Sequence, residues 1–265
     1  MVSKVDCTLN GGEDLGVWID EIFQLVDLIC LSILRSYRYI GIDWSINQQQ
    51  HGRMEAAKNL QSTRDRILDA AEHAFGADGF SGVGMKAIAR GAGVAQGLLH
   101  YHFDNKEGLY AAVIARRSGI INAERLAKLE RVDLSSSNAL TQILRAFLEP
   151  PLGEGGGGSA YARILAGLCA GDARDEDLVQ EHYDETATRF IDAMQIAFPD
   201  ASRLALSWGY SLAISTLVMG LSQSNRPERL ADADVRDSTE RDVAGTLIAY
   251  VEGGIRALMA QYPRN

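Results

Sequence analysis

The stretch GAGVAQGLLHYHF, Gly91 to Phe103, combines glycines with histidines, a tyrosine and a glutamine, and these residue types suit two kinds of chemistry. Closely spaced glycines are typical of the loop that cradles the phosphates of a dinucleotide cofactor. The same residues fit a tight turn between two short helices, the second of which presents polar and aromatic side chains to DNA. One interpretation predicts an enzyme, and the other predicts a DNA-binding protein.

The dinucleotide interpretation fails on both context and spacing. Such a loop follows a hydrophobic strand directly, whereas the segment before Gly91 is MKAIAR, which has helical propensity and a one-sided apolar face. The third glycine is expected at position 96, where the chain has Gln96. The sequence also contains no nucleophile elbow or Walker loop. We therefore expect no enzyme and no cofactor, and an enzyme without a recognisable motif stays an alternative.

The helix-turn-helix interpretation gives each residue a physical role. Gly93 can adopt the left-handed conformation that a short turn requires. If Leu99 and Phe103 face the core, an advance of about 100° per residue places Gly97 and Tyr101 on the opposite side of the helix. A side that offers glycine, tyrosine and flanking histidine is unusual for a solvated surface, and it suits a helix that enters a DNA groove.

We expect the residues around this helix to share the contacts with DNA. Amide, imidazole and hydroxyl groups reach phosphates and base edges, lysines neutralise phosphates, and a leucine can contact a thymine methyl group. His100 and His102 point about 200° apart around a helix, so we expect no metal site between them. The candidate DNA contacts are Lys86, Gln96, Gly97, Leu98, His100, Tyr101, His102 and Lys106.

The charge distribution agrees with a DNA-binding end. The whole chain has a net charge of −9, which is unfavourable for binding DNA. Residues 62–118, however, carry seven Lys and Arg against six Asp and Glu, while the regions on both sides are net acidic. Cysteines are scattered, and we expect a reducing cytoplasmic location.

Apolar residues recur at three- and four-residue spacing through most of the chain, which predicts an all-α protein. We expect an N-terminal extension over 1–61, a three-helix helix-turn-helix DNA-binding domain over 62–109, and a larger helical ligand-binding and dimerisation domain over 110–265. The stretch PPLGEGGGGS, Pro150 to Ser159, is typical of a flexible loop.

The segment Thr63 to Ile114 resembles the DNA-binding domain of the TetR/AcrR family of bacterial transcriptional regulators. The motifs that carry the resemblance are ILDAAEHAFGADGF, IARGAGV, YHF and NKEGL. Two helix caps depart from the family pattern, because Gly84 and Ala95 stand where Ser, Thr or Asp is usual. The resemblance implies a homodimer that binds a near-palindromic double-stranded DNA operator, and we expect it to act as a repressor, with an activator as the alternative. A small molecule in the C-terminal domain is then expected to release it.

The C-terminal domain contains candidate residues for that pocket and for the dimer. Small residues at Ala205, Gly209 and Gly220 permit close helix approach, so we expect dimerisation through helices over 201–222 and 240–261. A buried arginine in the pocket would favour an anionic ligand such as a carboxylate or acyl thioester. The candidate pocket residues, which mix apolar bulk with polar ends, are Tyr161, Arg163, Tyr183, Arg189, Phe190, Met194 and Trp208.

The first 61 residues allow two further hypotheses. Residues 1–53 are either an accessory extension or translated upstream sequence, with Met54 as the authentic start. The segment Trp18 to Ile42 is apolar, but its longest uncharged run is shorter than the roughly 20 residues that span a bilayer. We therefore expect no membrane partner, and a membrane-associated helical protein that uses this segment as an amphipathic anchor stays an alternative.

Overall fold

The computed structural model describes residues 44–171, 173–222, 226–232 and 242–263, and the side chains only from residue 62 onward. The chain divides into two compact units, Met1–Leu60 and Gln61–Asn265. The candidate anchor Trp18–Ile42 and most of the proposed extension 1–53 lie outside the described residues.

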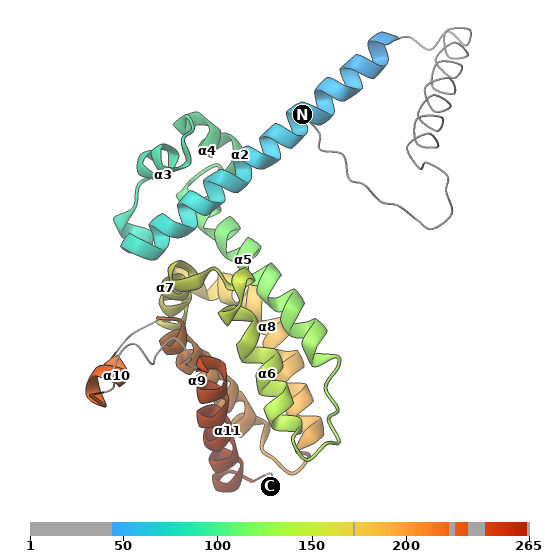
Figure 1. Ribbon diagram of the computed structural model, residues 1–265, viewed down its shortest axis with the longest axis vertical. Helices are drawn as coiled ribbons and strands as arrows, with labels where there is room; N and C mark the ends of the chain where they lie inside the picture. Colours follow the sequence, from blue (N-terminus) through green and yellow to red (C-terminus); the bar gives the residue numbers. More distant parts are fainter. Residues whose placement is uncertain (1–43, 172, 223–225, 233–241, 264–265) are drawn as a thin grey trace, which may run out of the picture. The chain divides into compact units, whose positions relative to one another are not determined.

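The described part of the chain is helical and contains no strand, which confirms the predicted all-α class. The elements, in the order drawn in Figure 1, are α2 (Trp44–Gly82), α3 (Met85–Ala92), α4 (Gln96–Phe103), α5 (Lys106–Leu129), α6 (Ala139–Leu152), the 3-10 turn η1 (Glu154–Gly156), α7 (Gly158–Cys169), α8 (Ala173–Ala197), α9 (Arg203–Leu221), α10 (Arg226–Leu230) and α11 (Val243–Gln261).

The second half of α2 packs with α3, α4 and the start of α5 around an apolar core. The buried side chains of this core include Leu68, Ile88 and Leu109. A cluster of Phe75, Phe80 and Tyr110 closes one side, with ring centroids 5.1 to 6.0 Å apart. The same core continues into α7, so the predicted boundary at residues 109/110 cuts through a shared core and stays a prediction.

Helices α5, α6, α8, α9 and α11 lie side by side as a bundle (Figure 1). Its centre is aromatic: the Phe147 ring lies 5.2 Å from that of Phe190 and 4.7 Å from that of Tyr210, measured between centroids. The predicted close approach of α9 is present within the chain. A Cβ atom at Gly209 would lie 2.6 Å from Ile255, and one at Gly220 would lie 2.7 Å from Leu247.

The prediction of a flexible loop over Pro150–Ser159 is wrong. Pro150 and Pro151 are buried inside the last turn of α6, η1 follows directly, and α7 already begins at Gly158. Proline in the last helical turn removes an N–H donor, so carbonyl groups one turn earlier lose their usual partners. The consequence appears at Phe147, whose carbonyl accepts a hydrogen bond from the side chain of Arg125 instead, at 2.9 Å from Nε.

Candidate DNA-binding face and interior cavity

The turn between α3 and α4 has the geometry that its glycine predicts. Gly93 adopts the left-handed conformation with φ of 65°, and the Val94 N–H donates back to the Ala89 carbonyl at 3.0 Å. Arg66 of α2 donates from Nη2 to the carbonyls of Ala92 and Gly93 at 2.9 and 3.2 Å. This arginine, which was not among the predicted site residues, fixes the turn against the first helix of the motif.

Helix α4 has one buried and one exposed side, as its helical periodicity predicts. Leu99 and Phe103 are buried, while Tyr101 on the opposite side is 72% exposed. Ala95 is the N-cap and supplies no side-chain hydrogen bond, so α4 begins without the usual cap. Asn105 caps the next helix, because its side-chain oxygen accepts from the Gly108 N–H at 2.8 Å. The next helix thus begins with a side-chain cap directly after α4 ends.

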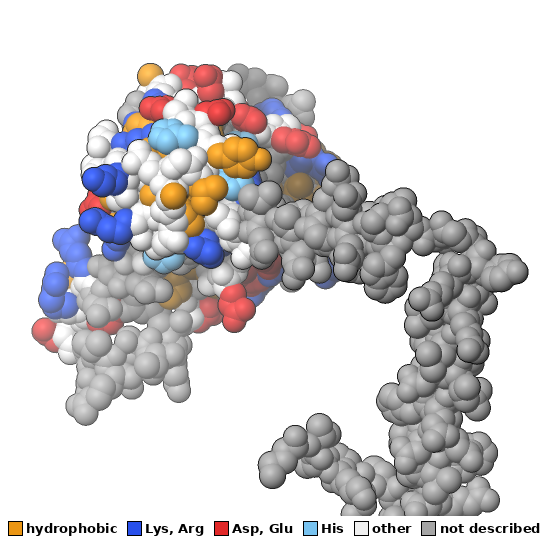
Figure 2. Space-filling view, turned by 90° about the horizontal axis from the view of Figure 1, so that it is seen from above, with side chains coloured by type: hydrophobic (Ala, Val, Ile, Leu, Met, Phe, Trp, Pro, Cys, Tyr) orange, Lys and Arg blue, Asp and Glu red, His pale blue; other side chains and the backbone are white. Residues whose placement is uncertain are grey.

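Most of the predicted DNA contacts lie in solvent near Tyr101. Lys86, Gln96, Gly97 and His100 are exposed, and no atom lies within 4 Å of the place where a Gly97 Cβ would stand. Figure 2 looks onto this end of the molecule and shows His, Lys and Arg side chains around a largely uncharged centre, with most Asp and Glu toward the rim. The surface can therefore approach a phosphate backbone closely.

The other three predicted contacts are half-buried. Leu98 is half-buried and packs against the core, which favours helix packing over insertion into the groove. His102 is half-buried, and its Nε2 has no hydrogen-bond partner among the described residues. The Lys106 ammonium lies 4.5 Å from the centroid of the Phe80 ring, a cation–π contact that orients it at the start of α5.

Two family models match separate parts of the chain. Residues 67–113 match the model of bacterial regulatory proteins of the tetR family. Residues 142–254 match that of the tetracyclin repressor-like C-terminal domain. The chain belongs to the TetR family. It is a DNA-binding transcriptional regulator and not an enzyme.

Individual relatives of this TetR-family regulator agree with that assignment. An uncharacterised HTH-type transcriptional regulator of Mycobacterium tuberculosis is 29% identical over 130 residues, which cover 43% of this chain and 63% of that protein. The chain thus spans less than two thirds of that relative. The regulator UidR of Escherichia coli is 44% identical over 54 residues, 20% of this chain and 28% of UidR.

Solved structures share the fold of the regulator. PfmR from Thermus thermophilus has a TM-score of 0.51 at 16% identity, covering 72% of this chain and 97% of PfmR. A TetR-family chain from Shewanella has a TM-score of 0.53 at 16% identity, covering 77% of this chain and 99% of that chain. At these identities the likeness shows the fold alone.

The regulator has an interior cavity between α5, α7, α8 and α9. Its free volume is about 20 Å³, which is room for roughly one water molecule. Tyr161 and Tyr183 line it, and their hydroxyl groups are hydrogen-bonded to each other. The full lining is Ile121, Arg125, Pro151, Gly156, Tyr161, Leu165, Tyr183, Tyr210, Ile214 and Leu221.

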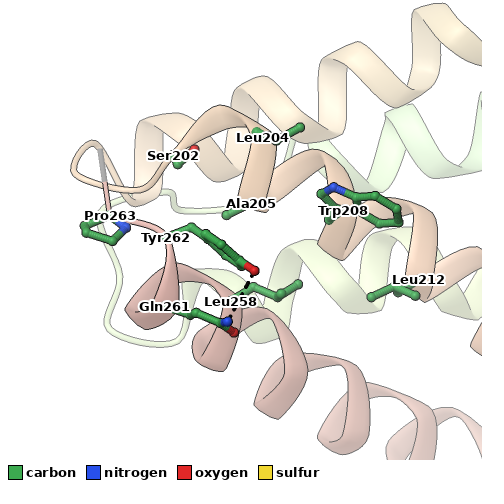
Figure 3. A pocket seen from close by; sticks show the side chains of 9 residues that line it. All are labelled: Ser202, Leu204, Ala205, Trp208, Leu212, Leu258, Gln261, Tyr262 and Pro263. Atoms are coloured by element: carbon green, nitrogen blue, oxygen red, sulfur yellow. Dashed lines mark hydrogen bonds between the residues drawn. The ribbon is translucent and has the colours of Figure 1, made fainter. Parts of the chain in front are cut away.

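The other candidate pocket residues lie elsewhere. Phe190 and Met194 are buried in the aromatic core of the bundle and do not line the cavity. Arg163 and Arg189 are exposed, so neither is the buried arginine that the pocket hypothesis requires. Trp208 is 58% exposed and lines a surface pocket between α9 and the end of α11 (Figure 3).

Arg125 of α5 is the cavity residue that sequence analysis missed. Its side chain is 4% exposed, donates from Nε to the Phe147 carbonyl, and stacks its guanidinium 4.2 Å from the centroid of the Phe147 ring. A signal was present, because Arg125 continues the buried face of α5 four residues after Ile121. Helical periodicity therefore places it inside, although its charge argues for the surface.

A buried ion pair connects the cavity wall with the helix-turn-helix part. Glu72 of α2 is 2% exposed and pairs with Arg116 at 3.0 Å and Arg117 at 2.8 Å. Arg117 Nη1 also donates to the Gly155 carbonyl at 2.8 Å, next to the cavity residue Gly156. A Cβ at Gly157 would lie 2.7 Å from both Arg117 and Glu72. The α6–α7 connection thus rests directly on this ion pair.

The outer sides of α9 and α11 form an apolar surface. Its large exposed side chains are Trp208, Leu212, Met219 and Tyr250. A groove of about 740 Å³ runs along the two helices between Leu212 and Tyr250. Ser207 and Ser211 lie on α9 as well, but each hydroxyl donates to a carbonyl four residues earlier, at 2.9 and 3.0 Å. Because these hydroxyls already have partners, covering the surface leaves few polar groups unsatisfied.

Proposed function

We propose that the protein is a ligand-responsive repressor that binds a near-palindromic double-stranded DNA operator as a homodimer. The observation that carries this proposal is α4, which buries Leu99 and Phe103 and exposes Tyr101 beside a glycine with open space around it. A helix with this division of its sides can enter the major groove while the rest of the motif contacts the backbone. DNA lies in the cytoplasm of bacteria, and we propose that the protein acts there.

The apolar surface of α9 and α11 supports the dimer. In a two-fold dimer the same surface of both subunits meets, and four helices form a bundle that buries the exposed apolar side chains. By length and composition alone, both helices could also cross a membrane. The core helices of soluble proteins often meet the same criterion, so it is only weak evidence for a membrane span. Gly209 and Gly220 bring the two helices together against Ile255 and Leu247, as expected for neighbours in a folded bundle.

The interior cavity supports a ligand response. The cavity has room for about one water molecule, so a larger ligand requires its walls to separate. Pro151 and Gly156 belong to that wall, and the neighbouring Gly155 carbonyl binds Arg117, the partner of Glu72 in α2. We infer that a ligand favours a state in which the two recognition helices of the dimer no longer match successive major grooves.

Selection of DNA from a random-sequence duplex library by the full-length protein tests the proposed function. We expect enrichment of a near-palindrome with half-sites about one helical turn apart. Fluorescence anisotropy should then show affinity roughly 10³-fold or more above that for a scrambled duplex at physiological salt. Absence of any enriched sequence, with equal affinity for both duplexes at every salt concentration, would overturn the proposal.

A lysine variant makes the same measurement specific to this surface. A plot of log affinity against log salt concentration has a negative slope. In Lys86→Ala this slope should be less steep by about one, because one phosphate contact is lost. Arg131→Ala is the control, since Arg131 is an exposed cation in the connection after α5. An equal change of slope in both variants would place the DNA on a different surface.

A further inference from the structure

Arg125 holds a positive charge inside the protein, and its position demands an explanation. No carboxylate among the described residues pairs with it, although its side chain is 4% exposed. Burying a cation without a counter-ion costs free energy, and buried charges in proteins are almost always paired. By contrast, the buried Glu72 has two arginine partners.

Structural roles explain only part of this arginine. Its Nε satisfies the Phe147 carbonyl, which has no N–H partner four residues later because Pro151 stands there. Its Nη1 donates to the Asn122 side-chain oxygen at 3.3 Å. Nη2 has no hydrogen bond to any described residue. A neutral donor would satisfy one carbonyl as well, so these contacts leave the charge unexplained.

The groups that share the cavity with Arg125 are suited to an anion. Burial raises the pKa of Tyr183 and Tyr210 to about 12, and it raises the pKa of Tyr161 well above its usual value. All three hydroxyls therefore keep their protons near neutral pH and can donate hydrogen bonds. Burial lowers the pKa of Arg125, yet a guanidinium remains protonated at that pH. The cavity thus offers one cation and several neutral donors.

We propose that this cavity receives the carboxylate of a mainly apolar effector, with Arg125 as its counter-ion. A guanidinium binds a carboxylate through two parallel hydrogen bonds, and Nη2 with Nη1 can supply them. The tyrosine hydroxyls donate to the same group, and the apolar lining, which includes Ile121, Leu165 and Ile214, takes the rest of the molecule. The inference rests on the proposed function, because it names the class of ligand that the regulator senses.

Entry of such a ligand has a structural consequence. The free volume of about 20 Å³ holds no organic carboxylate, so the wall that includes the hydrogen-bonded Tyr161 and Tyr183 must move outward. Pro151 and Gly156 belong to the same cavity wall. Their displacement changes the α6–α7 connection that rests on Arg117. Arg125 would thus bind the charged group of the ligand, and the apolar part of the ligand would displace the cavity wall.

Calorimetry on the full-length protein with matched probes tests the proposal. The probes are octanoate against octanol and phenylacetate against 2-phenylethanol, so each pair differs only in its carboxylate. We expect at least one carboxylate to bind about tenfold or more tighter than its alcohol. Arg125→Gln should abolish that preference, whereas Arg163→Gln, at an exposed arginine, should retain it.

A second variant keeps the test decisive if Arg125→Gln does not fold. Tyr183→Phe removes one donor and leaves the ring, and it should weaken carboxylate binding several-fold without changing alcohol binding. Equal binding of carboxylate and alcohol by the native protein, or no binding of either carboxylate, would overturn the proposal. A preference that survives in Arg125→Gln, or one that is undiminished in Tyr183→Phe, would overturn it as well.

The calorimetry is done without DNA, so the two proposals fail separately. Selection of a palindrome together with no carboxylate preference would remove the inference about Arg125 and leave the regulator intact. Absence of DNA selection would remove the proposed function, whatever the calorimetry shows. If both hold, the preferred carboxylate should weaken operator binding by the native protein and leave operator binding by Arg125→Gln unchanged.

Discussion

The helix-turn-helix part and the α9–α11 pair both leave large side chains in solvent, but the side chains differ in kind. Around α4 the exposed groups are a tyrosine hydroxyl, an amide, an imidazole and a lysine, with Tyr101 the most prominent. On α9 and α11 they are apolar, with Trp208, Leu212 and Tyr250 the largest. The polar surface around α4 can stay hydrated, whereas covering the apolar surface of α9 and α11 lowers the free energy of the protein in water.

This difference indicates how lasting each contact is. Contacts to phosphates depend on salt and exchange with water, so a polar surface suits a partner that is bound and released. An apolar surface with internally satisfied hydroxyls suits a partner that stays. In the proposed function, the DNA that is released and the second subunit that stays bound therefore contact separate elements, which are connected through α5, α7 and the Glu72 ion pair.

The largest effect is expected from a charge in the apolar surface. Leu212→Glu places two carboxylates in a two-fold interface, where burying an unpaired charge is strongly unfavourable. We expect a monomer in sedimentation velocity and a fall in operator affinity of about 100-fold, or roughly 3 kcal/mol. Ile196→Glu on α8 is the control, because Ile196 is exposed but lies outside this surface. A Leu212→Glu protein that remains dimeric would show that the permanent partner binds elsewhere.

The connection between the two regions is the next most sensitive point. Glu72→Gln leaves Arg116 and Arg117 without their buried counter-ion, and both arginines are partly exposed, which reduces the cost. We expect a loss of about 2–3 kcal/mol in the free energy of unfolding, or roughly 4–12 °C in thermal midpoint. Glu130→Gln, at an exposed carboxylate beyond the end of α5, should change neither. If the thermal midpoint is unchanged in Glu72→Gln, this ion pair does not connect the cavity wall with the helix-turn-helix part.

The two regions also differ in how far the sequence predicts them. The DNA-binding face is built from contiguous residues, so Gly93, Leu99 and Tyr101 could be placed by local turn chemistry and helical spacing. The cavity is built from helices far apart in sequence. Arg125 continues the buried face of α5, but the Phe147 carbonyl that it binds lies on another helix and is free because of Pro151. Propensity rules also read Pro150–Ser159 as a loop, although tertiary packing buries its prolines in α6.

A smaller effect is expected at the exposed tyrosine. Tyr101→Phe keeps the ring and removes the hydroxyl that we expect to donate to a phosphate oxygen. The loss of one such hydrogen bond should weaken operator binding about 2- to 10-fold, or roughly 0.5–1.5 kcal/mol, in fluorescence anisotropy. The oligomeric state and the salt dependence should stay as in the native protein, because no charge changes. A simultaneous loss of the dimer would mean that the two surfaces are not independent.

The finest test separates stability from DNA binding within α4 itself. Gly97 lies in a helix, has no neighbour within 4 Å of its missing Cβ, and does not adopt a positive φ. Gly97→Ala should therefore raise the free energy of unfolding by about 0.5–1 kcal/mol, because alanine loses less backbone entropy in a helix. The added methyl group should nevertheless stand between α4 and the DNA backbone and weaken operator binding. If Gly97→Ala binds the operator as tightly as the native protein does, this side of α4 does not press against DNA.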